Sequence, residues 1–203
     1  MYIFNGTSNF LVMVSSFFKK FFSFFSLFIF LSYLGNSQRW SQIGSDILSS
    51  NIQYMNPNFQ FGYSVSSNGD GTIIAVGAPN AAYESGTLDG QVTVYKYENS
   101  AWTQIGNNIN GLTGSGYRDH FGRSVSLSDD GTILAIGIPR YNKVGAVIIY
   151  QYTDNTWTQL GSIIEGVPHE SNPEGGDRSG FSVSLSNDGT IVAIGGPEYI
   201  GEN

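Results

Sequence analysis

Two histidines are the residues of this chain best suited to proton transfer near neutral pH. His120 and His169 are the only histidines in the sequence, and both fall in polar loops. A histidine serves as a general base when a nucleophile lies within hydrogen-bond reach and a third group orients its ring. His120 directly follows Asp119, but no nucleophile elbow, phosphate-binding loop or zinc-ligand spacing accompanies either histidine. The sequence therefore predicts a protein with no catalysis of its own.

Composition excludes further classes of chemistry. The chain has no cysteine, which removes thiol nucleophiles, thiolate zinc sites and disulfide frameworks. Its formal net charge is −7, and it becomes −9 when residues 1–37 are set aside with their two lysines. Nucleic acids and anionic membrane surfaces require a basic footprint, so neither is an expected partner.

One phrase occurs three times along the chain. Each copy runs from a Ser-Val-Ser triplet through an Asp-Gly-Thr-Ile turn to an alanine, a glycine and a proline. The turn glycines Gly71, Gly131 and Gly189 lie 60 and 58 residues apart. A spacing of this size is typical of stacked or radial repeats, in which no unit folds alone.

A second phrase, Trp-Ser/Thr-Gln-Ile/Leu-Gly, alternates with the first. Its tryptophans are Trp40, Trp102 and Trp157, and each is followed by a glycine four residues later. Tryptophans can act as sugar-stacking platforms, but these recur at one repeat position. We therefore interpret them as packing residues of an outer strand.

The elements that carry these phrases read as short strands. Apolar and polar residues alternate over 124–127, and an Asp-Gly turn separates this segment from the β-branched run 132–136. Two further strands are expected at 146–152 and 157–160, and residues 63–66, 72–76, 91–97 and 102–105 repeat the plan. Four-stranded antiparallel meanders at a fixed period predict an all-β fold of β-propeller blades. The expected parts are a lone fourth strand at 40–44, blades at 61–106 and 121–161, and a half blade at 180–203.

Features that recur once per unit favour a role in the fold, whereas singular loop residues favour a role in binding. Asp119 recurs as Asp177, which indicates a structural task in the loop before the first strand. The acidic loop 165–177 is singular and is a further place to look for ligand contacts. The remaining binding-loop candidates are Tyr83, Glu84, Tyr117, Arg118, Arg140 and Tyr141.

The repeated phrases resemble the FG-GAP repeat, which builds the N-terminal β-propeller of integrin α subunits. The resemblance rests on Phe61-Gly62 with Gly77-Ala78-Pro79, and on Phe121-Gly122. It covers nearly all of residues 39–203, and its style is similar to the variant common in secreted bacterial surface proteins. The third copy departs from the pattern because it reads Ser179-Gly180. The Asp-Gly strand pair also resembles WD40 blades, but the period near 60 exceeds the roughly 40–45 of that repeat.

The same resemblance implies a candidate calcium site, because integrin-type blades hold calcium in an Asp-rich loop between the first two strands. Calcium takes six to eight hard oxygens, so several carboxylates must share a tight turn. Asp70, Asp130 and Asp188 occupy the matching turns, but none has the third carboxylate of that loop. Hairpin turns without metal are the favoured interpretation, and no cofactor is expected.

The N-terminal 37 residues look like a secretory signal peptide outside the fold. Residues 21–34 are apolar apart from serines, too short for a membrane span of about 20 residues. Lys19 and Lys20 precede this stretch, and small residues at 35–37 fit cleavage before Gln38. An ordinary leader length results if the true start is Met13; the alternative is an uncleaved signal anchor.

These features predict a secreted or cell-surface propeller module that binds an extracellular protein or glycan. An extracellular hydrolase supported by the propeller is one alternative, and a purely structural repeat array is another. In a closed propeller, the lone fourth strand at 40–44 would pair with the last blade and remove its exposed edge. Residues 38–203 alone are accordingly expected to be marginally stable.

Overall fold

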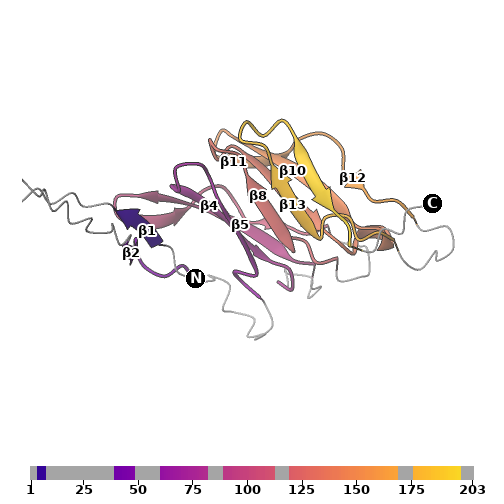
Figure 1. The fold of residues 1–203 in the computed structure, drawn as a ribbon, viewed down its shortest axis with the longest axis horizontal. Helices are drawn as coiled ribbons and strands as arrows, with labels where there is room; N and C mark the ends of the chain where they lie inside the picture. The colour runs from indigo at the N-terminus through magenta and orange to yellow at the C-terminus, as the bar shows by residue number, and fades with distance from the viewer. Residues whose placement is uncertain are drawn as a thin grey trace, which may run out of the picture.

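The computed structural model describes residues 4–7, 39–48, 60–81, 89–112, 119–168 and 176–197. Within these ranges every regular element is a β-strand, apart from one 3₁₀ turn, η1 (Tyr141–Lys143). The all-β prediction is confirmed, and two four-stranded antiparallel sheets give the molecule a blade-like, propeller-like architecture (Figure 1). No helix in the described part of the chain is long and apolar enough to cross a membrane.

The first sheet is an antiparallel meander in the order β3-β4-β5-β6. Gly71 adopts a φ of 74° in the turn between its first two strands, a conformation that glycine tolerates without steric cost. Each strand lies within two residues of its predicted position. The strands are β3 (Ser64–Ser67), β4 (Ile73–Ala78), β5 (Gln91–Glu98) and β6 (Ala101–Gln104).

The second sheet repeats this meander in the order β8-β9-β10-β11. Its register matches the first, since Ser124 faces Gly137 just as Ser64 faces Gly77. The predicted strands again agree within two residues. The strands are β8 (Ser124–Leu127), β9 (Ile133–Ile138), β10 (Ala146–Thr153) and β11 (Thr156–Gln159).

The outer edge of each blade differs from the prediction of one continuous fourth strand. One half of β5 pairs with β6, while Gln91 and Val92 pair with a separate strand, β7 (Ile109–Asn110). Gly106 adopts a φ of 67° between β6 and β7 and interrupts the edge. The second blade is split in the same way by β12 (Ile164–Glu165), which pairs with β10.

The third unit contains the hairpin β13 (Ser182–Leu185) and β14 (Val192–Gly195), at the position of the predicted half blade. The predicted lone strand at 40–44 corresponds to β2 (Arg39–Gln42), which pairs with β1 (Phe4–Thr7). The sequence interpretation placed residues 1–37 outside the fold as a leader, and β1 lies within that segment. The rest of the predicted leader, including Met13 and residues 21–34, lies outside the described residues.

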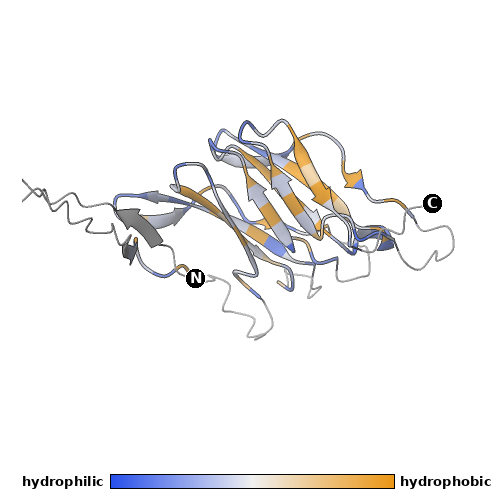
Figure 2. Cartoon of the chain, in the orientation of Figure 1, coloured by the Kyte–Doolittle hydropathy of each residue, from blue (hydrophilic) through white to orange (hydrophobic). Residues whose placement is uncertain are grey.

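The main core lies between the two sheets. Val92 and Val94 of β5 belong to the same apolar cluster as Phe121 and the β9 and β10 residues Ile136 and Ile148. Figure 2 shows hydrophobic segments along the strands and hydrophilic segments in the turns between them. Burial alternates along β3 and β8, whereas consecutive residues are buried in β4, β5 and β9, so these inner strands are covered on both faces.

Consecutive units meet along surfaces that we call seams: β3 and β4 contact β8, and β8 and β9 contact β13. In Figure 1, β13 lies beside β8 in this way. Val125 of β8 is 8% exposed inside the stack, whereas Val65, at the same repeat position in the first unit, is 55% exposed. Covering a valine side chain stabilises the fold by about 1.5 kcal/mol or more, so the seam stabilises the second unit at Val125 in a way that the first unit lacks at Val65.

Both serines of the Ser-Val-Ser triplet cross a seam. The first hydroxyl donates to a backbone carbonyl of the next unit, and the second accepts from a backbone amide of the next unit. The triplet is therefore repeated because it satisfies backbone groups of the following blade. The four bonds are Ser64 Oγ to Gly122 O (2.8 Å), Ser124 Oγ to Gly180 O (2.9 Å), Leu127 N to Ser66 Oγ (3.0 Å) and Leu185 N to Ser126 Oγ (2.9 Å).

The tryptophans make contacts in the opposite direction, toward the preceding unit. Trp157 is 8% exposed, and its ring covers Gly106, where a Cβ would lie 2.7 Å from Trp157 Cδ1. Trp102 covers Gly44 in the same way, which confirms the packing interpretation for both residues. Trp40 is 65% exposed, and no described atom lies within 4 Å of a Cβ built on Gly161. The indole bonds are Trp102 Nε1 to Ile43 O (3.2 Å) and Trp157 Nε1 to Ile105 O (3.3 Å).

Candidate functional site

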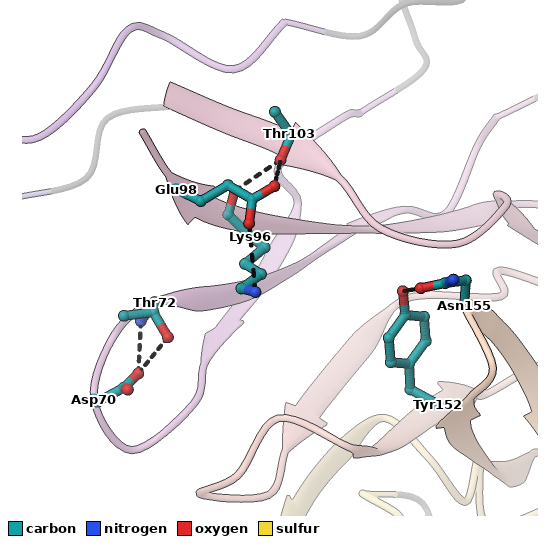
Figure 3. A network of polar contacts seen from close by, with 7 residues as sticks. All are labelled: Asp70, Thr72, Lys96, Glu98, Thr103, Tyr152 and Asn155. Atoms are coloured by element: carbon teal, nitrogen blue, oxygen red, sulfur yellow. Dashed lines mark hydrogen bonds and ion pairs between the residues drawn. The ribbon is translucent and has the colours of Figure 1, made fainter. Parts of the chain in front are cut away.

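The three Asp-Gly turns use their carboxylates to hold the turn. Asp70 Oδ1 accepts hydrogen bonds from Thr72 N at 2.9 Å and Thr72 Oγ1 at 2.6 Å (Figure 3). Asp130 and Asp188 bind their own threonines in the same way, and each also accepts a serine hydroxyl at 2.6 Å. These are Asx turns, which satisfy the backbone within the hairpin.

The hydrogen bonds favour the ionised form of each carboxylate. The Thr72 hydroxyl lowers the pKa of Asp70, and the Ser128 hydroxyl makes the largest contribution to the lowered pKa of Asp130. The Ser186 hydroxyl and Thr190 lower the pKa of Asp188 to about 2. Among the described residues, no three His, Asp or Glu side chains are grouped closely enough to hold a metal ion.

The outer strands carry a second set of polar contacts. Lys96 and Glu98 form an exposed ion pair of 3.4 Å, and Thr103 Oγ1 donates to Glu98 Oε1 (Figure 3). Tyr152 donates to Asn155 Oδ1 across the neighbouring outer hairpin. Exposed pairs of this kind contribute about 0–1 kcal/mol, so they stabilise the surface only weakly.

One cavity, of about 270 Å³, lies where the three units meet, and we call it the rim pocket. Its walls come from the start of the first strand and the end of the second strand of the hairpins. These two points are adjacent because the strands pair antiparallel. The lining residues are Gln60, Tyr63, Pro79, Asn80, His120, Arg123, Pro139, Arg140, Arg178 and Phe181.

The rim pocket is built from the same few repeat positions in each unit. Gln60, His120 and Arg178 stand two residues before the glycine that opens each first strand, and Tyr63, Arg123 and Phe181 follow that glycine. The backbone amide of the later residue donates to the carbonyl of the earlier one, which closes a turn and brings the two positions together. The bonds are Tyr63 N to Gln60 O (2.9 Å), Arg123 N to His120 O (3.0 Å) and Phe181 N to Arg178 O (3.1 Å).

The first of these positions has left-handed backbone in all three units. The φ angles are 54° at Gln60, 60° at His120 and 55° at Arg178. Residues other than glycine adopt this region at a cost of about 1–2 kcal/mol. The fold thus holds three non-glycine side chains in a strained conformation at the wall of one cavity.

Arg123 occupies the middle of the rim pocket. Its guanidinium carbon lies 4.4 Å from the ring centroids of both Tyr63 and Phe181, so the cation stacks between aromatic rings of the first and third units. Burial lowers the pKa of Arg123 from its ordinary value. The ion pair found among the described residues joins Lys96 to Glu98, so it involves neither Arg123 nor Arg140.

The structure brings some of the predicted site residues together and not others. Arg140 lines the rim pocket, whereas Tyr141 begins η1 and packs against the main core cluster. His120, which the sequence places in a polar loop, is half-buried in the pocket wall. The other binding-loop candidates, Tyr83, Glu84, Tyr117 and Arg118, and also His169, lie outside the described residues.

Sequence reasoning missed Arg123, Arg178, Tyr63 and Phe181 as pocket residues. The available signal was variation within the repeat: aligned copies hold Tyr, Arg and Phe at the position after the glycine, while the serines that follow stay the same. Variation at fixed spacing marks positions that the packing of the units does not dictate.

No protein-family description matches the sequence, and no curated protein matches it. The structure is similar to one described as the structure of the Pseudomonas aeruginosa periplasmic gluconolactonase PpgL, with 19% sequence identity and a TM-score of 0.42. The match covers 66% of this chain and 36% of that one. The fold assignment above rests on strand pairing, and no activity is carried over from this likeness.

Proposed function

We propose that this chain is an FG-GAP-type β-propeller module, secreted or held at the cell surface, which binds an extracellular glycan or protein and has no catalysis of its own. The observation that carries the proposal is the rim pocket, where three units place different side chains at equivalent positions. Constant residues build the seams, and apart from the repeated Pro79 and Pro139 the residues that line the cavity vary between units, a division expected of a scaffold that presents a binding site.

The structure gives the Phe-Gly and Gly-Ala-Pro phrases a physical role that supports the FG-GAP assignment. Phe121 is fully buried in the main core, and Gly122 adopts a φ of 82° directly after it. A Cβ on Gly77 would collide with the carbonyl oxygen of Gly122. The Phe-Gly segment of the second unit therefore packs directly against the Gly-Ala-Pro segment of the first. Pro79 then ends the strand and forms part of the pocket wall.

The extracellular location rests on the leader-like sequence of residues 1–37. Expression of the full gene product with its leader tests it. We expect the exported protein to begin at Gln38 by N-terminal sequencing. Retention of the leader on a membrane-bound product would replace this proposal with the signal-anchor alternative.

The binding role is tested by screening the full chain against immobilised extracellular glycans and proteins, with two pocket variants alongside. Arg140→Asn and His120→Gln install the side chains that the first unit carries at these positions, so both preserve the repeat fold. We expect each to weaken capture of any ligand at least severalfold, because each removes a polar contact at the pocket. Lys96→Gln, which removes an exposed cation on an outer strand, is the matched control.

Two results would contradict the proposal. Unchanged capture by both pocket variants would place binding elsewhere on the molecule. Turnover of a glycan or ester that depends on His120 would favour the extracellular hydrolase, because His120 lines the cavity and is the histidine within the described residues.

A further inference from the structure

The rim pocket is strongly cationic in an acidic protein. Among the residues that the structure describes, three arginines and one histidine line it and no Asp or Glu does, although the chain as a whole carries a net charge of −7. A concave surface of one sign concentrates its field and attracts ligands of opposite charge. The local charge therefore differs in sign from that of the molecule around it.

The neighbouring carboxylates do not line the pocket. Asp119 precedes His120 but is fully buried, and its backbone carbonyl accepts a hydrogen bond from Arg140 N at 3.3 Å. Asp177 precedes Arg178 and accepts hydrogen bonds from the backbone amides of Ser179 and Val167. Asp177 thus holds the loop behind the wall, and neither Asp119 nor Asp177 is among the described residues that line the cavity.

The stacking of Arg123 leaves its hydrogen-bonding capacity at the pocket. The guanidinium carbon lies over both the Tyr63 and the Phe181 ring, and the group carries five N–H donors. Two aromatic contacts restrict the movement of the guanidinium, so a ligand meets donors that are already positioned in part. An arginine fork arranged in this way matches the two oxygens of a carboxylate or the oxygens of a sulfate.

We infer that the rim pocket binds a sugar that bears an acidic group, with the acid at Arg123 and its neighbours Arg140 and Arg178. This inference rests on the proposed binding function and names its ligand class. Tyr63 and Phe181 are partly exposed at the pocket and offer apolar faces to a sugar ring. The cavity of about 270 Å³ lies at the lower end of ligand pockets, which fits one sugar residue better than an extended peptide.

Titration calorimetry of the full chain with three matched probes tests the inference. D-Glucuronate and glucose share one ring and differ in a carboxylate, and glucose 6-sulfate presents the alternative acid. We expect at least one acidic probe to bind about tenfold or more tightly than glucose, since a charge-assisted hydrogen bond is worth about that factor. The preference should shrink in 1 M salt, where charges are screened within about 3 Å. Comparison of the two acids identifies which one the pocket prefers.

Variants locate the effect. Arg140→Gln removes an exposed cation without disturbing the stack, and Arg123→Lys keeps the charge while losing the planar fork. We expect each to weaken binding of the preferred acidic probe about tenfold while binding of glucose stays the same. Lys96→Gln should leave both unchanged.

Equal affinity for glucose and the acidic probes would overturn the inference and leave the proposed binding function standing. Tighter binding of a hexaglutamate peptide than of either acidic sugar would overturn the sugar assignment in favour of an acidic protein ligand. If Arg140→Gln and Arg123→Lys both retained full binding of the acidic sugar, the binding site would lie outside the rim pocket.

Discussion

The seams and the rim pocket are built from the same repeat, yet they treat its positions in opposite ways. At the seams, each unit carries identical serines and glycines, as at Ser64, Ser124 and Ser182. At the rim, the equivalent residues differ, as at Gln60, His120 and Arg178. The backbone is the same in both regions, because all three rim residues share a left-handed φ.

The difference follows from what each side chain contacts. A seam serine bonds the backbone of the next unit, and every unit offers the same backbone groups, so the same side chain is required each time. A rim side chain faces a cavity, where no neighbouring backbone dictates its type. Repetition thus marks the parts that hold the units together, and divergence marks the part that is free to acquire a ligand.

Removal of a seam tryptophan is expected to cause the largest loss of stability. Trp157→Ala removes a buried ring and its hydrogen bond to Ile105 O, and we expect a loss of about 3–5 kcal/mol in the free energy of unfolding. Trp40→Ala removes the equivalent but exposed ring and should change the free energy of unfolding by about 0.5 kcal/mol or less. Urea denaturation of both variants measures the contrast, and similar losses would refute the role of burial across the seam.

Loss of a seam hydroxyl comes next. Ser126→Ala leaves the amide of Leu185 without its serine acceptor, which should cost about 1–3 kcal/mol. Ser184 holds the same position in the third unit but is exposed, so Ser184→Ala serves as the control and should cost little. If the two urea midpoints fall together, the hydroxyl does not stabilise the seam.

Relief of strain at the rim should act in the opposite sense. His120→Gly removes the side chain that resists a φ of 60°, and we expect a gain of up to about 1 kcal/mol in stability. The same change removes a pocket wall residue, so ligand capture should weaken while the thermal midpoint rises. A variant that loses stability would show that His120 contributes packing that outweighs its backbone strain.

The turn carboxylates give the smallest effect, and it depends on pH. The pKa values of Asp70, Asp130 and Asp188 are lowered in the folded chain, so their contribution is complete above the unfolded value of about 3.9. It is lost as pH falls through the folded values, toward about 2 for Asp188. Urea midpoints measured from pH 5 to pH 2 should decline, and Asp188→Asn should flatten part of that decline.

Much of the fold was predictable because its signals are local. Alternation in 124–127 and the turn around Gly131 place β8 and β9 within two residues of their observed bounds. The split outer edge was not, because pairing of β7 with β5 depends on how the chain turns after Gly106. The pairing of β1 with β2 likewise joins segments that no local pattern relates.

The rim pocket was predictable only in part. Arg140 stood out as a singular loop residue. Arg123 lies inside a repeated phrase and was therefore interpreted as part of the repeat. Its neighbours Tyr63 and Phe181 lie about 60 residues away in either direction along the chain, and only the stacking of units brings them to the same cation. A sequence shows such a site once its repeats are aligned and their differences are compared.

The seam contacts also give the stack a direction. The first and second units each extend an indole toward the unit before and serine hydroxyls toward the unit after, so the two faces of a unit are chemically unlike. The face around Val65 and the face around Ser184 are thus as distinct as the two ends of a polar filament. Consecutive units of this chain therefore meet head to tail, with the serine face of one unit against the opposite face of the next.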